Sequence, residues 1–429
     1  MEILKDWKFV RKEMLAGIIT FLTMSYILIV NPIILGSTGM DKGALFTATA
    51  LASAIGTLCM ALIARIPIAQ APGMGLNSFF AATVVLTMGY SWQFALTAVF
   101  IEGIIFIILT FFNVREIIVN SIPQTLKNAI PVGIGLFITF IGLQNAGLVV
   151  DSPHTMITLG SLADKGVWVA MIGLVLTGVL LARNIHGAIL IGILTATVFG
   201  VFVDVTKLPE GSLVSLPPSI LPVFAQFEWA HIFTFDMLIV VFTFLFVNLF
   251  DTVGTLIGVA SKAGLIDKNG NFPQVKKALF ADALGTTFGA ILGTSTVTSY
   301  VESAAGVAAG GRTGLTAIST ALMFLIALFL APIFLMVPAQ ATAPALIIVG
   351  LFMLSSVIKI DFNDLTESIP AFLTMIMMPF AYSIAQGIIF GMLGYVFIKM
   401  LAGRKKDIKL PVYIISALFL MKIILDVSL

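Results

Sequence analysis

Two acidic side chains lie in segments where a charged group is unexpected. Glu302 follows a run rich in threonine and serine, and Asp251 lies inside a long apolar run. If these runs cross a membrane, their ionisable residues are costly and are functional by default. A carboxylate accepts hydrogen bonds from ligand N–H groups or carries a proton. Glu302 and Asp251 are therefore candidate binding or proton-carrying residues, although Ser299-x-x-Glu302 also fits a capping box, in which Glu302 caps the next helix.

Polar residues around Asp251 form a stripe. Asn248, Asp251, Thr252 and Thr255 follow the i, i+3, i+4, i+7 spacing of one helix face. Such a stripe faces the interior of a helix bundle or a water-filled cavity. Asn and Thr also hydrogen-bond between membrane helices, and we favour that interpretation for Asn248 and Thr252. For Asp251 we favour a functional role.

Two segments interrupt the helical pattern. In 69–80, a proline and two glycines predict extended chain and a helix that starts no earlier than about residue 76, capped by Asn77 or Ser78. In 294–301, β-branched residues predict extended chain before a second short helix. Irregular backbone at membrane depth is tolerated where it is buried in protein or lines a cavity. Two such breaks that face each other would form a polar site.

Two further acids lie within apolar segments, Glu102 and Asp282. Either could relay protons, and either could instead bond to a break in a neighbouring helix. Because neither belongs to a broken segment or to the polar stripe, we favour the structural role while keeping both as proton-coupling candidates beside Asp251 and Glu302.

The composition is that of a membrane protein. Of 429 residues, 59% are hydrophobic and 10% charged, whereas a soluble domain has about 25% charged residues. The apolar segments are continuous and close to the length that crosses a bilayer, which predicts helices rather than a barrel. We predict spans at 14–35, 43–64, 71–87, 91–112, 128–147, 166–182, 184–203, 233–260, 275–292, 298–309, 312–335, 343–358, 369–383 and 385–402. Residues 410–427 are either a further span or a helix along the membrane or the protein.

Charge distribution orients these spans. Placing Lys5, Lys8, Arg11 and Lys12 inside puts most other basic loop residues on the same side. The first apolar segment has no cleavage site of small residues, so we expect it to be retained. This predicts a multi-pass cell-membrane protein with a cytoplasmic N-terminus, surrounded by lipid. The single Cys59 excludes an intrachain disulfide, and the net charge of +2 gives no reason to expect a nucleic-acid partner.

The two halves of the chain share a pattern. Gly135-Leu136-Phe137 and Gly350-Leu351-Phe352 each follow a proline by twelve residues, and the broken segment is the third span of each half. Two halves of seven spans must have opposite orientations. This predicts the inverted repeats of a secondary transporter, in which paired broken helices mark the binding site.

Several motifs resemble the nucleobase–cation symporter-2 family, and within it the azaguanine-type branch of adenine, guanine and hypoxanthine permeases. The resemblance covers nearly the whole chain and rests on AGIITFLTMSYILIVNP at 16–32, AQAPGMGLNSFF at 69–80, NLFDTVGTLIG at 248–258 and TSTVTSYVESAAGVAAGGRTG at 294–314. It implies an all-α membrane fold of about 14 helices in two inverted seven-helix repeats, with short strands before the third and tenth spans. It also implies a core domain (1–112 and 233–336) and a gate domain (113–232 and 337–429).

The resemblance implies a purine site as well. Asp251 and Glu302 match the acids of the eighth and tenth spans, and Asn77 matches an asparagine of this branch. Uracil and xanthine members carry Glu and a nearby His on the eighth span, where this chain has Asp251 and Thr255, which favours purines. Ser299 and Tyr300 beside Glu302 complete the candidate set with Phe79, which is either a packing residue or a surface for base stacking.

The expected function is import of hypoxanthine, guanine or adenine by proton symport, with no other cofactor. A sodium-coupled transporter and an anion exchanger of the same fold stay as alternatives. No span contains a histidine with a nucleophile or a metal-binding pair, so we do not expect an enzyme. Relatives in the family also imply that a homodimer can form, which nothing in the residues shows.

Overall fold

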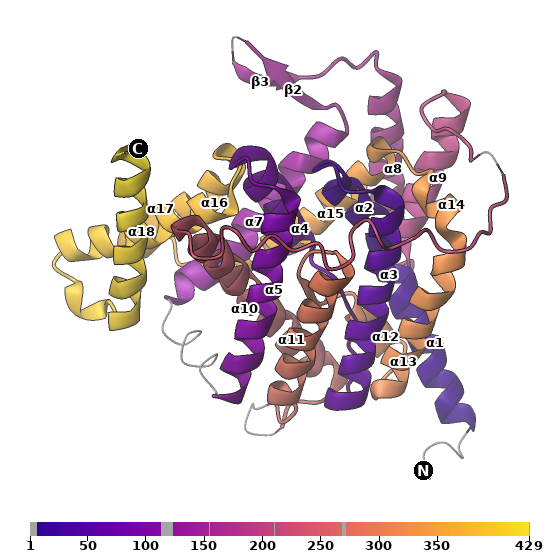
Figure 1. Ribbon diagram of the computed structural model, residues 1–429, viewed down its shortest axis with the longest axis horizontal. Coiled ribbons are helices and arrows are strands. Elements are labelled where there is room, and N and C mark those ends of the chain that lie inside the picture. The colour runs from indigo at the N-terminus through magenta and orange to yellow at the C-terminus, as the bar shows by residue number, and fades with distance from the viewer. Residues whose placement is uncertain (1–6, 113–122, 154, 210, 268–271, 429) are drawn as a thin grey trace.

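A computed structural model describes residues 7–112, 123–153, 155–209, 211–267 and 272–428 (Figure 1). Of the residues used above for orientation, Lys5 lies outside this part. The first predicted span is two helices, α1 (Trp7–Met24) and α2 (Ile27–Gly36), which meet at Ser25 and Tyr26. Hydroxyls of Thr23 and Ser25 bond to preceding carbonyls at this turn. The two helices together, Trp7–Gly36, form one stretch that is long and apolar enough to cross a membrane, in agreement with the span predicted at 14–35.

The remaining predicted spans each overlap helical structure. In the first half the helices are α3 (Lys42–Cys59) with η2 (Met60–Ala64), α4 (Met74–Ser78) with η3 (Phe79–Thr87), α5 (Trp92–Phe111), α7 (Gln124–Asn145), α8 (Lys165–Ala182) and α9 (Ala188–Phe202). In the second half they are α10 (Phe235–Ala263), α11 (Val275–Leu292), α12 (Ser303–Ala308), α13 (Gly314–Ala327) with η4 (Leu328–Leu330) and α14 (Ala331–Leu335), α15 (Ala339–Met353) with η5 (Leu354–Lys359), α16 (Leu365–Phe380) and α17 (Ile384–Leu401). Within the described residues, nine helical stretches are long and apolar enough to cross a membrane.

Strands lie at both predicted breaks. β1 (Gln70–Pro72) pairs antiparallel with β4 (Val297–Ser299), with Ala71 opposite Thr298. The start of α4 was predicted wrongly: the helix begins at Met74 with Gly73 as its N-cap, and neither Asn77 nor Ser78 caps it. Because the Gly73 N–H donates to the Thr296 carbonyl across the strand pair, the helix can begin directly after β1. A hairpin of β2 (Val149–Ser152) and β3 (Met156–Leu159) was not predicted.

Elements that hold the same place in each half lie against each other. β1 pairs with β4, α3 packs on α11, and α7 packs on α15. At each helix crossing two glycines allow close approach: a Cβ on Gly285 would lie 3.3 Å from Gly56 Cα, and a Cβ on Gly135 would lie 2.7 Å from the Gly350 carbonyl oxygen. Equivalent positions therefore meet at three levels, as expected for inverted repeats related by an approximate two-fold axis.

The last helix, α18 (Leu410–Ser428), covers the segment left open above and packs against α17. Ion pairs hold the connection between α17 and α18. Arg404 donates to Asp364 at 2.6 Å and to Asp407 at 2.9 Å, and its hydrogen bond lowers the pKa of Asp364 to about 2. The buried Lys399 ammonium lies 2.8 Å from Glu367 of α16. These ion pairs tie the turn between α17 and α18 to the start of α16.

Candidate functional site

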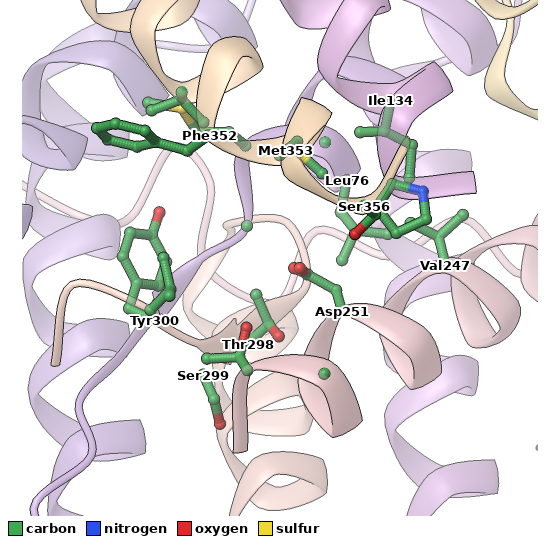
Figure 2. Close-up of a pocket in the computed structure, with 18 of the residues that line it drawn as sticks. Leu76, Ile134, Val247, Asp251, Thr298, Ser299, Tyr300, Phe352, Met353 and Ser356 are labelled. Carbon is green, nitrogen blue, oxygen red and sulfur yellow. The ribbon is translucent and has the colours of Figure 1, made fainter. Parts of the chain in front are cut away.

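A cavity of about 330 Å³ lies where the strand pair meets α10 and α12 (Figure 2). Its polar lining includes side chains of Asp251, Thr255, Ser299, Tyr300 and Glu302. The lining on the other side comes from α7, α15 and η5, and is mostly apolar, with Ile134, Val349, Phe352, Met353 and Ser356 among its residues. An apolar pocket with a few convergent polar groups, at the lower end of the usual ligand-pocket volumes, is suited to a small flat ligand.

Glu302 lies in the turn that connects the end of β4, at Ser299, to the start of α12, at Ser303. This position brings it to the cavity. Glu302 occupies the N-cap position of α12, but its side chain makes no capping bond, so the capping-box interpretation is wrong. Its Oε1 instead accepts a hydrogen bond of 2.5 Å from the Tyr26 hydroxyl. One carboxylate oxygen is therefore held by the protein, and the carboxylate lies on the cavity wall.

Tyr26 is a cavity residue that the sequence analysis did not identify. It is buried, and it lines the cavity from the break between α1 and α2. The pattern that could have revealed it is a phenol in the middle of an apolar span, directly after the hydroxyl residues that weaken the helix. The bond from Tyr26 to Glu302 joins the first span to the segment that precedes α12.

The polar stripe of α10 divides between two environments. Asp251 and Thr255 line the cavity, and Figure 2 shows the Asp251 side chain projecting into it. Asn248 and Thr252 are fully buried and bond to other helices. The interhelical role favoured for Asn248 and Thr252 agrees with these contacts.

Ser299 and Tyr300 line the cavity with their hydroxyl groups already bonded. The Tyr300 hydroxyl donates to the Pro72 carbonyl at 2.6 Å, which ties the end of β4 to β1. The Ser299 hydroxyl donates to Asp282 at 3.2 Å. Tyr300 therefore offers its ring, rather than its proton, to a ligand.

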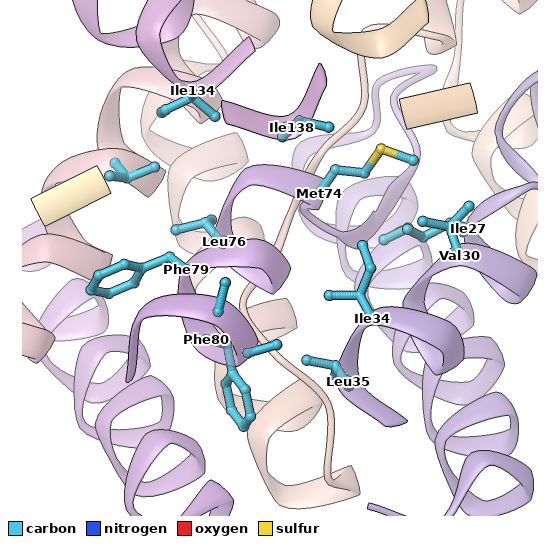
Figure 3. Close-up of a cluster of buried hydrophobic side chains, with 14 of the residues drawn as sticks. Ile27, Val30, Ile34, Leu35, Met74, Leu76, Phe79, Phe80, Ile134 and Ile138 are labelled. Atoms are coloured by element: carbon cyan, nitrogen blue, oxygen red, sulfur yellow. The ribbon is translucent and has the colours of Figure 1, made fainter. Parts of the chain in front are cut away.

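Asn77 and Phe79 do not line the cavity. Asn77 is fully buried and its Oδ1 accepts a hydrogen bond from Ser295, so it holds the chain entering β4. Phe79 packs edge-on against Phe244 with ring centroids 4.8 Å apart, within the apolar cluster of Figure 3. In this structure both residues support the broken segments from behind.

Glu102 and Asp282 also lie behind the strands rather than on the cavity. Glu102 accepts from Asn248 at 2.9 Å and from Thr296 at 2.6 Å. Asp282 accepts from Gln70 at 3.0 Å, and its other oxygen lies 3.0 Å from the Thr252 hydroxyl. Hydrogen bonds through other side chains therefore join the two candidates to the cavity lining, as from Asp282 to Ser299.

The sequence of this chain matches a protein family described as "Permease family" over residues 11–390. The adenine permease AdeP of Escherichia coli strain K12 is 45% identical over 414 residues, covering 96% of this chain and 93% of AdeP. The guanine/hypoxanthine permease PbuG of Bacillus subtilis strain 168 is 46% identical over 423 residues, covering 96% of each chain.

Solved structures show the same fold at low identity. The transmembrane domain of the cyanobacterial bicarbonate transporter BicA superposes with a TM-score of 0.64 at 16% identity, covering 91% of this chain and 98% of that domain. This similarity confirms the prediction of a helical membrane-transporter fold. With the family match and two full-length relatives above 40% identity, the chain is a multi-pass membrane permease that belongs to the nucleobase–cation symporter-2 family.

Proposed function

We propose that this chain imports purine nucleobases by proton symport. The observation that carries the proposal is the pair of carboxylates, Asp251 and Glu302, on the wall of one otherwise largely apolar cavity. The names of AdeP and PbuG support a purine as the ligand, since they state adenine and guanine/hypoxanthine transport for those proteins. Two acids and one lysine, Lys359, line the cavity, and this excess of acidic groups opposes an anion as the ligand, because like charges repel.

The cavity offers the contacts that a purine needs. Glu302 accepts from ring N–H groups with the oxygen that Tyr26 leaves available. Tyr300 gives a ring for stacking, and Phe352 and Met353 close the apolar side. Asp251 binds the base from α10 or holds the coupling proton. A flat base would then lie between the strand pair and α15.

Transport requires the cavity to open to each side of the membrane in turn. We propose that the core domain (1–112 and 233–336) moves against the gate domain (113–232 and 337–429), with the N-terminus in the cytoplasm. The position of the cavity supports this division, since Asp251, Tyr300 and Glu302 come from the first set of ranges, and Ile134 and Phe352 from the second. No cofactor other than the proton is proposed.

Uptake of labelled adenine, guanine and hypoxanthine into cells that lack their own purine permeases tests the proposal. We expect accumulation that a protonophore abolishes, that removal of sodium leaves unchanged, and that unlabelled purines compete away. Uptake that requires sodium would instead identify sodium as the coupling ion. Bicarbonate or sulfate exchange without purine uptake would contradict the proposal and favour an anion exchanger.

Replacing Tyr26 by Phe tests whether this tyrosine positions Glu302. The change removes the bond to Glu302 and keeps the ring. We expect KM for the transported purine to rise about tenfold or more, as for a lost hydrogen bond to a charged group. The pH profile of uptake should also change, because the carboxylate loses its fixed donor.

Tyr413→Phe is the matched control. Its hydroxyl makes a 3.4 Å contact with the Lys405 carbonyl near the start of α18 and does not line the cavity. Equal KM values and equal pH profiles for Tyr26→Phe and Tyr413→Phe would mean that Tyr26 does not position Glu302.

A further inference from the structure

Glu13 is a buried acidic residue away from the cavity. It lies on α1, which packs on both α12 and α13, and its side chain is fully buried (Figure 1). Its Oε1 accepts a hydrogen bond from the Arg312 N–H at 2.9 Å. Its Oε2 accepts from the Thr313 N–H at 3.2 Å and from the hydroxyls of Thr313 and Thr316 at 3.0 and 2.5 Å. Both oxygens are therefore bonded to the turn between α12 and α13 and to the start of α13.

The turn that Glu13 holds closes the far end of α12. Gly310 reverses the chain with a φ of 108°, a value that favours glycine. The Arg312 guanidinium donates to the carbonyls of Val307 and Gly311 at 2.5 and 2.7 Å, and Val307 belongs to the last turn of α12. α12 has only six residues, and a helix this short is not stable in isolation. Its position must therefore come from the contacts at its two ends.

The segment 13–26 lies along α12. In the middle of α12, a Cβ on Gly306 would lie 2.6 Å from the Ala16 carbonyl oxygen, so the two helices touch without a gap. At the cavity end, the Tyr26 hydroxyl donates to Glu302 Oε1 at 2.5 Å. About 16 Å of helix separates Glu13 from the end of α1 at Met24. One segment therefore holds α12 at both ends and in the middle.

We propose that Glu13 is a positioning residue for Glu302. By holding the turn after α12 against α1, Glu13 fixes where this short helix lies along α1. The carboxylate of Glu302, at the other end of α12, thereby keeps its place on the cavity wall. The inference rests on the proposed function, because it treats Glu302 as the group that binds the base.

Glu13→Gln tests this role, because glutamine has the shape of glutamate but only one oxygen. That oxygen accepts from one of the two N–H groups of Arg312 and Thr313, and the other N–H then faces the NH₂ group of the glutamine. Binding of labelled adenine, guanine and hypoxanthine to the purified protein is measured. We expect the dissociation constant to rise about tenfold, as for a lost hydrogen bond to a charged group.

A double-mutant cycle with Tyr26→Phe separates positioning from a general loss of stability. Both changes release the carboxylate of Glu302, one at each end of the same contact between α1 and α12. The dissociation constant of the double variant should therefore rise by less than the product of the two single effects. A change in stability alone would leave the two effects on binding independent.

Ser319→Ala is the matched control. The Ser319 hydroxyl also joins α13 to α1, through the Met14 carbonyl at 2.9 Å, but it lies beyond the turn that follows α12. This variant should bind purine as the wild type does. Equal losses of affinity in Glu13→Gln and Ser319→Ala would mean that Glu13 contributes only to the packing of α1 on α13.

Hydrogen exchange of the ligand-free protein, followed by mass spectrometry, tests the position of α12 without a substrate. Peptides that cover 302–309 should exchange faster in Glu13→Gln than in the wild type and in Ser319→Ala, because the far end of α12 is released. If Glu13→Gln yields no folded protein, Thr316→Val takes its place, since it removes one hydroxyl that bonds to the same carboxylate. The same changes in exchange and in affinity are expected for it.

Unchanged exchange over 302–309, or unchanged affinity for purine, in the folded variant would overturn the positioning role. Effects of Glu13→Gln and Tyr26→Phe that multiply would also overturn it, because the two residues would then act independently. A wild type that binds no purine would refute the proposed function. The exchange comparison would in that case still decide whether Glu13 holds α12.

Discussion

Glu302→Gln should abolish saturable purine uptake at concentrations where the wild type is half-saturated. The amide has one oxygen, which Tyr26 occupies, and its NH₂ group would face the ring N–H groups that the carboxylate oxygen accepts. A hydrogen bond to a charged group contributes about 1.5–3 kcal/mol, so each lost bond weakens binding by about ten- to a hundredfold. The measurement is equilibrium binding of labelled purine to purified protein, together with uptake.

Glu228→Gln is the control for this change. Glu228 lies outside the helices, where its carboxylate is bonded to His231 and Ser91, and it does not line the cavity. Binding should be unchanged in this variant. A dissociation constant for Glu302→Gln equal to that of the wild type would remove Glu302 from the binding site, and with it the observation that carries the proposed function.

Gly350→Ala should destabilise the whole protein. A Cβ at this position would lie 2.5 Å from the Gly135 carbonyl oxygen and 2.0 Å from the Thr139 hydroxyl. The first of these atoms is backbone of the opposing helix α7, so α7 and α15 would have to separate. Overpacking of this kind costs about 1–3 kcal/mol or more. We expect a lower melting temperature in detergent and a lower yield of folded protein, measured by fluorescence-detected size exclusion after heating.

Gly178→Ala is the matched control on a membrane helix. Within the described residues, no atom apart from the neighbouring residues and backbone of α8 itself lies within 4 Å of the Cβ that this change adds. Alanine also favours a helix over glycine by about 1 kcal/mol. This variant should melt at or above the wild-type temperature. If Gly350→Ala and Gly178→Ala have the same melting temperature, the close contact between the two repeats is not important for stability.

Hydropathy and charge predicted most of the architecture, because the bilayer requires long apolar helices that satisfy their own backbone. The strand segments were predictable too, since β-branched residues and a Pro-Gly pair exclude a helix. The turn at Ser25 and Tyr26 was not, because single hydroxyl residues in a mostly apolar run are compatible with a continuous membrane helix. The start of α4 was also missed, because the carbonyl oxygen that accepts from the Gly73 N–H belongs to Thr296, in the other half of the chain.

The sequence indicated only part of the candidate site, because contacts between distant parts of the chain cannot be read from the sequence. Spacing placed Asp251 and Thr252 on one stripe, but a helix has neighbours on several sides, and only packing decides which side chain meets the cavity. Pairs such as Glu102 with Asn248 join residues far apart in the chain, and no periodicity connects them. Asn77 and Phe79 were attractive because of their segment, yet their contacts place them behind it.

The pairing of β1 with β4 has a consequence for how the protein is made. β1 is synthesised long before β4. Gln70 has a partner from the start in Thr57, but the Ala69 carbonyl and the Gly73 N–H, on either side of β1, lack during that time the partners Tyr300 and Thr296 that they have in the finished protein. Hydrocarbon cannot satisfy such groups. The newly made first half must therefore be kept out of direct contact with lipid at this point, in the insertion machinery or against its own helices, until Val297–Ser299 emerges. Completion of the second half would then be the step that commits the first half to the membrane.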